Sequence, residues 1–195
     1  IAAFFSGGVF ISTGDEVERV RASAVTPEFF PLFKTNAIRG RVLQAGDLQE
    51  GRDVEVVVIS HALWQGRFGG TSDVVNRKIT LNGKPVTIAG IMPAGFNYPN
   101  EAEIWTPFLL SPAKEARENR YVNVVTGLRP GVSIVQAQAE MDTINQRLAQ
   151  NYVDTNTGWS VRLTELRESL VGELRTSLLI LLAAVAFVLL IACAN

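Results

Sequence analysis

The hydrophobic residues of this chain are most concentrated in its last stretch, from Ser177 to Ala194. These 18 consecutive residues carry no charge, and Ser177 is the only polar residue among them. A helix on the surface of a soluble core keeps one polar face, and this run has none. As a helix it would be about 27 Å long, close to the roughly 30 Å hydrocarbon core of a bilayer. The pattern therefore predicts a membrane-spanning helix over residues 177–195.

Shorter apolar stretches in the rest of the chain predict an α+β fold, because strand-like alternation and helix-like spacing follow one another. Glycine-containing polar segments separate these stretches: a turn is expected at 6–8 and a polar loop at 44–53. Strands are predicted at 1–5, 9–12, 17–25, 54–59, 104–108, 121–128 and 158–166.

A hairpin is the clearest local prediction, with its turn at Asn82 and Gly83. Asn-Gly suits a type I′ turn because both residues tolerate the positive φ angles that this turn requires. Pro85 has no N–H to donate to a ladder, so it should face outward from an edge. One face of the hairpin is expected to carry Ile79, Leu81, Val86 and Ile88.

Helices are predicted where a hydroxyl residue precedes an apolar pattern. Thr26 is expected to cap a short helix that places aromatic side chains in the core, and Ser60 to cap another that ends at Gly69 and Gly70. Ser133 and Gln136 predict a capping box that begins an amphipathic helix running to about residue 152. Together with the strands predicted at 121–128 and 158–166, this helix would form a strand–helix–strand unit.

Composition excludes several functions. The 18 Lys and Arg and the 19 Asp and Glu residues give a net charge of −1 without a basic cluster, so no nucleic-acid partner is expected. The single histidine, His61, and the single cysteine, Cys193, build neither a zinc site nor a Cys/His nucleophile pair. Phosphate-binding Gly-x-x-x-x-Gly-Lys-Ser/Thr loops are absent as well. The sequence therefore predicts no catalytic, cofactor-binding or metal-binding residue, and a protein that is not an enzyme.

The residues between the last predicted strand and the apolar run read LRESLVGELRTS. Apolar residues recur there at helical spacing, which predicts an amphipathic lead-in over residues 167–176. Gly172 would allow a bend, so Leu170, Gly172 and Leu174 are candidates for a hinge that transmits motion between the span and the preceding domain. The alternative is that this segment is only a connector.

Six sequence segments along the chain resemble those of a known protein family. They occur in the order GRVLQAGD, VVVISHALWQGRFGG, KITLNGKPVTIAGIMPAGF, IWTPF, LRPGVSIVQAQAEMDTINQRLAQNY and LLAAVAFVLLIACAN. Together they resemble the periplasmic core domain and following membrane helix of MacB-like, FtsX-type ABC transporter permeases, in particular duplicated orphan permeases of the acidobacterial type.

This resemblance implies an inner-membrane protein with residues 1–176 on the periplasmic side. It also implies one span before Ile1 and further spans after Asn195, which agrees with a chain that lacks an initiator methionine and is expected to be part of a longer protein. Residues 1–166 would form the external domain, with a small β-rich lobe inserted at about 54–108. The implied partners are membrane lipid, a separate cytoplasmic ATPase and further copies of the chain.

Two functions remain open from the sequence. One is a non-catalytic permease subunit whose external domain couples membrane rearrangement to a substrate or partner. The other is a membrane-anchored binding or adhesion module without a transport role. A soluble enzyme with a buried terminal helix is disfavoured by the apolar run and by the missing site chemistry.

Overall fold

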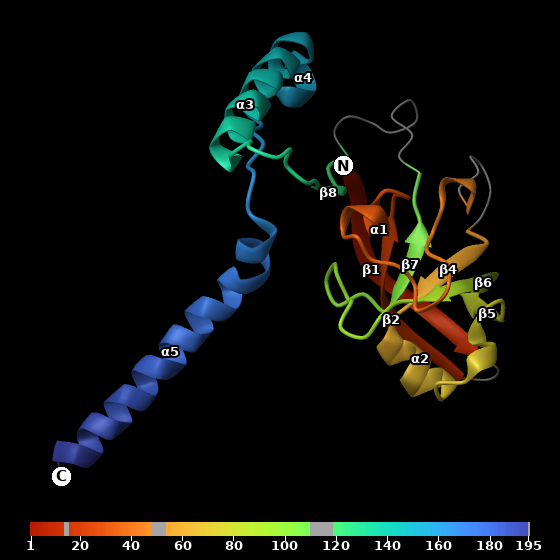
Figure 1. Ribbon diagram of the computed structural model, residues 1–195. Helices are drawn as coiled ribbons and strands as arrows, with labels where there is room; N and C mark the ends of the chain where they lie inside the picture. The colour runs from red at the N-terminus through yellow and green to blue at the C-terminus, as the bar shows by residue number, and fades with distance from the viewer. Residues whose placement is uncertain (14–15, 48–53, 110–118, 195) are drawn as a thin grey trace. The chain divides into compact units, whose positions relative to one another are not determined.

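The computed structural model describes residues 1–13, 16–47, 54–109 and 119–194 (Figure 1). It divides the chain into two compact units, Ile1–Gly127 and Leu128–Asn195. The first unit is built on a β-sheet with short helices and the second is helical, so the predicted α+β class is confirmed.

The described strands of the first unit form one sheet that curls until its path closes. The path runs β2–β7–β4–β6–β5–β1 and returns to β2, while β8 pairs with β1 and β3 with β6. Two neighbouring pairs in the ring, β1–β5 and β4–β7, share only two residue pairs each. The strands are β1 (Ala2–Thr13), β2 (Glu16–Val25), β3 (Arg39–Gly40), β4 (Val56–Ile59), β5 (Lys78–Leu81), β6 (Lys84–Ile91), β7 (Ile104–Pro107) and β8 (Asn123–Val125).

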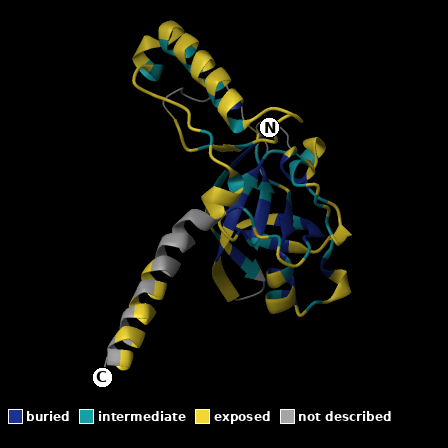
Figure 2. Cartoon of the chain, turned by 60° about the vertical axis from the view of Figure 1, so that its left-hand side comes forward, coloured by how far each residue is buried: buried dark blue, intermediate teal, exposed yellow. Residues whose placement is uncertain are grey.

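Alternation along the strands separates two cores, one on each face of the sheet. The first core gathers side chains such as Val20 and Ile104 under α2 (His61–Phe68) and the short 3₁₀ helix Ser72–Val74. The second gathers the opposite side chains, such as Val25 and Trp105, under α1 (Phe29–Leu32). Figure 2 shows these buried positions concentrated in the strands. A second 3₁₀ helix, Ala45–Asp47, follows β3.

The hairpin predicted at Asn82 and Gly83 is confirmed. Both residues have positive φ angles, 50° and 79°, and Leu81 pairs with Lys84 across the turn. Pro85 is exposed, as its missing N–H requires. The four apolar residues predicted for one face all lie in the core beneath α2: Ile79, Leu81, Val86 and Ile88.

Two local predictions in the first unit are wrong. The expected turn at 6–8 is part of β1, which continues through Gly7 and Gly8 because β2 pairs with it along that whole length. Thr26 is not a helix cap: its hydroxyl accepts a hydrogen bond from the Ala3 amide (3.1 Å), and α1 begins three residues later. Ladder contacts thus outweigh the local preference of glycine and threonine. The predicted loop at 44–53 lies partly outside the described residues.

Two other helix starts are confirmed. Ser60 Oγ accepts a hydrogen bond from the Leu63 amide (3.1 Å), and α2 ends at Gly69 in the left-handed conformation (φ 61°). In the second unit, Ser133 and Gln136 form the predicted capping box at the start of α3 (Ile134–Asn151). Side-chain caps of this kind satisfy amide groups that have no partner within the helix.

The strand predicted at 158–166 is wrong. Residues 158–165 form no strand, and the helix α4 (Val153–Asn156) precedes them. Side chains of α3 hold this segment instead, since Asn145 Nδ2 donates to the Trp159 carbonyl (2.6 Å). The predicted strand at 121–128 is reduced to β8, which pairs with β1. The expected strand–helix–strand unit is therefore absent from the described residues.

The last helix, α5 (Leu166–Ala194), contains both the predicted lead-in and the apolar run up to its end. Asn195 lies outside the described residues. Within the part of the chain that the structure describes, no helix has both the length and the apolar composition needed to cross a membrane.

Candidate functional site

The residues predicted as a hinge all lie in α5. Leu170, Gly172 and Leu174 follow one another over little more than one turn, and the helix is continuous through them. Leu170 is exposed. The hinge therefore stays a prediction, now located within a single uninterrupted helix.

Catalytic or metal-binding chemistry is not assembled in the described part of the chain. His61 contacts Trp64 edge-on, with ring centroids 5.3 Å apart. No group of three or more His, Cys, Asp or Glu among the described residues could hold a metal ion. What these residues offer instead is two hollows, one on each face of the ribbon formed by β1 and β2.

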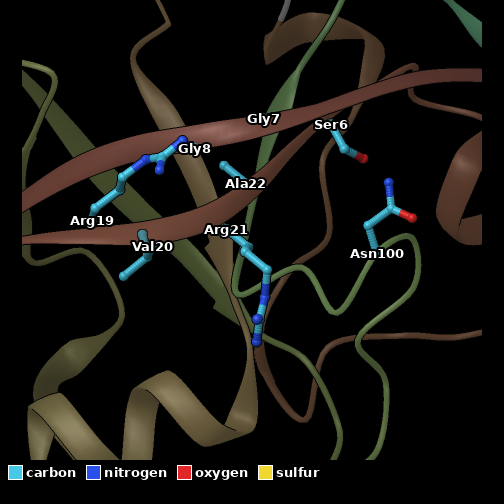
Figure 3. A pocket seen from close by; sticks show the side chains of 8 residues that line it. All are labelled: Ser6, Gly7, Gly8, Arg19, Val20, Arg21, Ala22 and Asn100. Carbon is cyan, nitrogen blue, oxygen red and sulfur yellow. The ribbon is translucent and has the colours of Figure 1, made fainter.

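The first hollow has a volume of about 410 Å³, and we call it the polar hollow because its lining includes the polar side chains of Ser6, Arg19, Arg21 and Asn100 (Figure 3). Arg19 and Arg21 are two positions apart on β2, so their side chains leave the same face of the strand. Ser6 lies on β1, where its hydroxyl is hydrogen-bonded to that of Ser23 (2.8 Å). Asn100 comes from the loop before β7 and completes the wall.

Arg21 anchors that loop to the ribbon. Its Nη2 lies 3.3 Å from Glu101 Oε2, and its Nε donates to the Glu101 carbonyl (3.1 Å). Asn100 and Glu101 both have left-handed φ angles of 54°. Consecutive non-glycine residues in this region are unfavourable and persist where surrounding contacts hold them. The contacts of Arg21 therefore fix the position of Asn100 at the hollow.

Arg19 is exposed and forms no hydrogen bond or ion pair with any residue that the structure describes. Its guanidinium lies across Gly8 of the neighbouring strand, where a Cβ atom would overlap its Nε. Gly8 has no positive φ angle, so a Cβ there would only require the flexible end of the Arg19 side chain to move. The hollow thus contains two different arginines: Arg21 is bound to Glu101, whereas the donors of Arg19 face solvent.

The second hollow, about 480 Å³, lies where β1 and the β5–β6 hairpin diverge. Its lining is mainly apolar and includes Phe5, Val9, Ala22, Ala24, Leu81 and Val86. The small residues of β1 and β2 leave this space open. Among the residues that line the two hollows, none is a nucleophile paired with a base.

Sequence reasoning missed the first hollow. One signal was present, the alternation that places Arg19 and Arg21 on one side of a strand. No sequence signal pointed to the loop that forms the rest of the wall, because Glu101 is 80 residues from Arg21 in sequence. Only the pairing of β2 with β7 brings them together.

The curled sheet, covered by short helices and flanked by a hollow on each face of one ribbon, defines an α+β domain. Residues 1–144 match the family described as the MacB-like periplasmic core domain. The chain belongs to this family, whose members are domains of ABC transporter permeases.

Three solved structures share the fold. A domain of a putative permease protein from Porphyromonas gingivalis aligns with a TM-score of 0.58 at 18% identity, covering 87% of this chain and 78% of that one. The extracellular domain of the noncanonic ABC-type transporter YknZ, from Gram-positive bacteria, gives 0.56 at 18% identity, with 80% and 76% covered. The periplasmic region of MacB from Actinobacillus actinomycetemcomitans gives 0.54 at 11% identity, with 80% and 68% covered. No curated protein matches the sequence significantly.

Proposed function

We propose that this chain is the external domain of an ABC-type permease together with the start of the membrane helix that follows it. The observation that carries the proposal is the family match over residues 1–144, followed by a helix in which no charged residue occurs after Arg175. In this proposal the apolar run from Ser177 crosses the inner membrane in contact with lipid, and residues 1–176 lie on the extracytoplasmic side.

The external domain has a coupling role in this proposal. Rearrangement of the membrane helices moves it, and its movement acts on a substrate or partner outside. These 195 residues contain no phosphate-binding loop, and in this proposal a separate cytoplasmic ATPase supplies nucleotide hydrolysis. The subunit itself would be non-catalytic, and further copies of the chain would complete the assembly.

The continuity of α5 supports this role. A helix that runs from Leu166 into the apolar run can carry a displacement along its axis, whereas a flexible connector would absorb it. Gly172 would be its most deformable point, because glycine lowers helix stability by about 1 kcal/mol relative to alanine. Leu170 and Leu174 would lie on either side of the bend.

Thiol labelling of the full-length protein in intact cells tests the topology. Cys193→Ala, with any cysteine outside these 195 residues also replaced, removes the native thiols, and Val135→Cys places a new one at an exposed position of α3. A membrane-impermeant maleimide should label this cysteine before lysis. Labelling only after lysis would place the domain in the cytoplasm and refute the proposal.

The coupling role needs a separate measurement, the ATPase activity of the intact complex. Gly172→Pro should weaken the effect of the external domain on ATPase activity, because proline in a helix interior destabilises the helix by about 3 kcal/mol. Gly172→Ala stiffens the same position without breaking the helix, so it should also lower coupling if this position has to bend. Unchanged coupling in the proline variant would reject the hinge. If no ATPase copurifies and the full protein has no other span, the chain is instead an anchored binding module.

A further inference from the structure

One face of the β1–β2 ribbon is left without a covering element among the described residues. Strand register places Gly8 beside Arg21, Phe10 beside Arg19 and Ser12 beside Val17. Alternation puts these six side-chain positions on the same face as Phe4 and Val25, the face that α1 covers nearer the start of β1. We call the six positions the ribbon face.

Two large apolar side chains stand exposed on the ribbon face. Phe10 is 54% exposed and Val17 is 66% exposed, whereas Phe4 and Val25, on the same face, are 7% and 0% exposed. Phe10 and Val17 belong to successive residue pairs on this face, Phe10–Arg19 and Ser12–Val17, so they lie diagonally across the ribbon from each other. Exposed apolar groups bordered by polar residues are typical of binding surfaces.

Three residues of the ribbon face also line the polar hollow: Gly8, Arg19 and Arg21 (Figure 3). Arg19 lies opposite Phe10 across the ribbon, with donors that no other described residue uses. Arg21 is already paired with Glu101. The surface therefore presents an apolar patch and one available guanidinium side by side, which suits a carboxylate that has an apolar neighbour.

We propose that the ribbon face binds an acidic segment of a partner protein outside the cytoplasm. A carboxylate of the segment pairs with Arg19, and an apolar side chain packs on Phe10 and Val17. The inference rests on the proposed function only in placing the face outside the membrane.

Local charge favours a protein segment over a lipid surface. Glu101 and Glu103 lie against Arg21, so the two arginines of the face do not create a net positive field. Attraction to anionic lipid generally requires clusters of four or more basic residues. A single carboxylate needs only the correctly placed guanidinium.

Photo-crosslinking in cells that produce the full-length protein tests the inference. A benzophenone amino acid in place of Val17 serves as the probe, and mass spectrometry identifies the attached peptide. The expected adduct is a protein segment that contains Asp or Glu. Arg19→Ala should reduce its yield roughly tenfold, the size of effect common for an arginine central to an interface.

Two glycine variants separate the position of Arg19 from its charge. Gly8→Ala should also reduce the adduct, because the new Cβ displaces the guanidinium while the charge remains. Gly7→Ala is the matched control, since a Cβ at that position meets nothing within 4 Å. Thermal unfolding of each variant must match that of the parent chain. Should Gly8→Ala unfold early, Arg19→Ala and Arg19→Lys decide the result, with lysine expected to restore part of the yield.

Four outcomes would overturn the inference: an adduct with lipid, an adduct with a segment that lacks carboxylates, no adduct, or a yield unchanged by Arg19→Ala. The labelling of Val135→Cys reports independently on topology. Failure of the proposed function is therefore distinguishable from failure of this inference.

Discussion

The side chain of Gln138 pairs with the backbone around Leu163 as a neighbouring β-strand would. Its Oε1 accepts a hydrogen bond from the Leu163 amide (2.8 Å), and its Nε2 donates to the Val161 carbonyl (2.7 Å). One amide side chain thus satisfies a donor and an acceptor two residues apart. An extended segment is held against α3 without any sheet.

Gln138→Ala should release this segment. Loss of its two hydrogen bonds to Val161 and Leu163 predicts a local destabilisation of about 1–3 kcal/mol. Amide hydrogen exchange at Leu163 should accelerate by roughly tenfold or more, while exchange in the strands of the first unit stays unchanged. Gln146→Ala, at an exposed position of the same helix, is the control. Equal exchange rates in the two variants would show that Gln138 does not hold the segment.

The same contact explains which parts of the fold were predictable from sequence. The Asn82–Gly83 turn and the caps at Ser60 and Ser133 depend on residues a few positions apart, and all three were predicted correctly. The segment 158–165 has the alternation of a strand, but a strand needs a partner, and here side-chain amides take that place. Local patterns cannot reveal such a substitution.

Strand pairing between segments that are distant in the sequence accounts for the other features that could not be predicted. From the sequence alone, Gly7 and Gly8 predict a turn, but they belong to β1 because β2 pairs with them. The ring closes because β1 reaches Leu81 of β5, a contact between distant segments that alternation alone does not specify. The polar hollow depends on the same kind of pairing, since β2 and β7 bring Asn100 to Arg21.

Glycine substitutions should have opposite effects at two positions. Gly83 has a φ of 79° with open space around it, so Gly83→Ala should lower stability by about 1 kcal/mol through backbone strain alone. Gly66 lies within α2, also in open space and without a positive φ, so Gly66→Ala should raise stability by about 0.4–1 kcal/mol. Thermal unfolding of the two variants measures both effects. Shifts of the same sign would contradict the turn geometry.

Phe29 should be among the most sensitive core positions. It is the first residue of α1, is fully buried, and contacts several aromatic rings, including that of Tyr98, which stacks on it with centroids 6.0 Å apart. Phe29→Ala should therefore destabilise the first unit by about 3–5 kcal/mol in urea unfolding. Phe10→Ala removes the same side chain from an exposed site and should change stability by less than about 1 kcal/mol. Comparable losses in both variants would mean that Phe10 is covered in the folded protein.

The ion pair between Arg41 and Asp47 should contribute to acid stability. Burial raises the pKa of Asp47, but hydrogen bonds from the Arg41 guanidinium and the Gln44 amide lower it by more, so the pKa lies below its ordinary value. A carboxyl whose pKa is lower in the folded state stabilises the fold above its unfolded pKa of about 3.9, and this contribution is lost as the pH falls through the folded value. Urea unfolding from pH 7 to pH 2 should show Asp47→Asn less stable than the parent at neutral pH, with the difference shrinking below about pH 4. Glu140→Gln, at an exposed position of α3, should give no such pH-dependent difference. A difference for Asp47→Asn that stays constant down to pH 2 would show that the ionised carboxylate does not stabilise this turn.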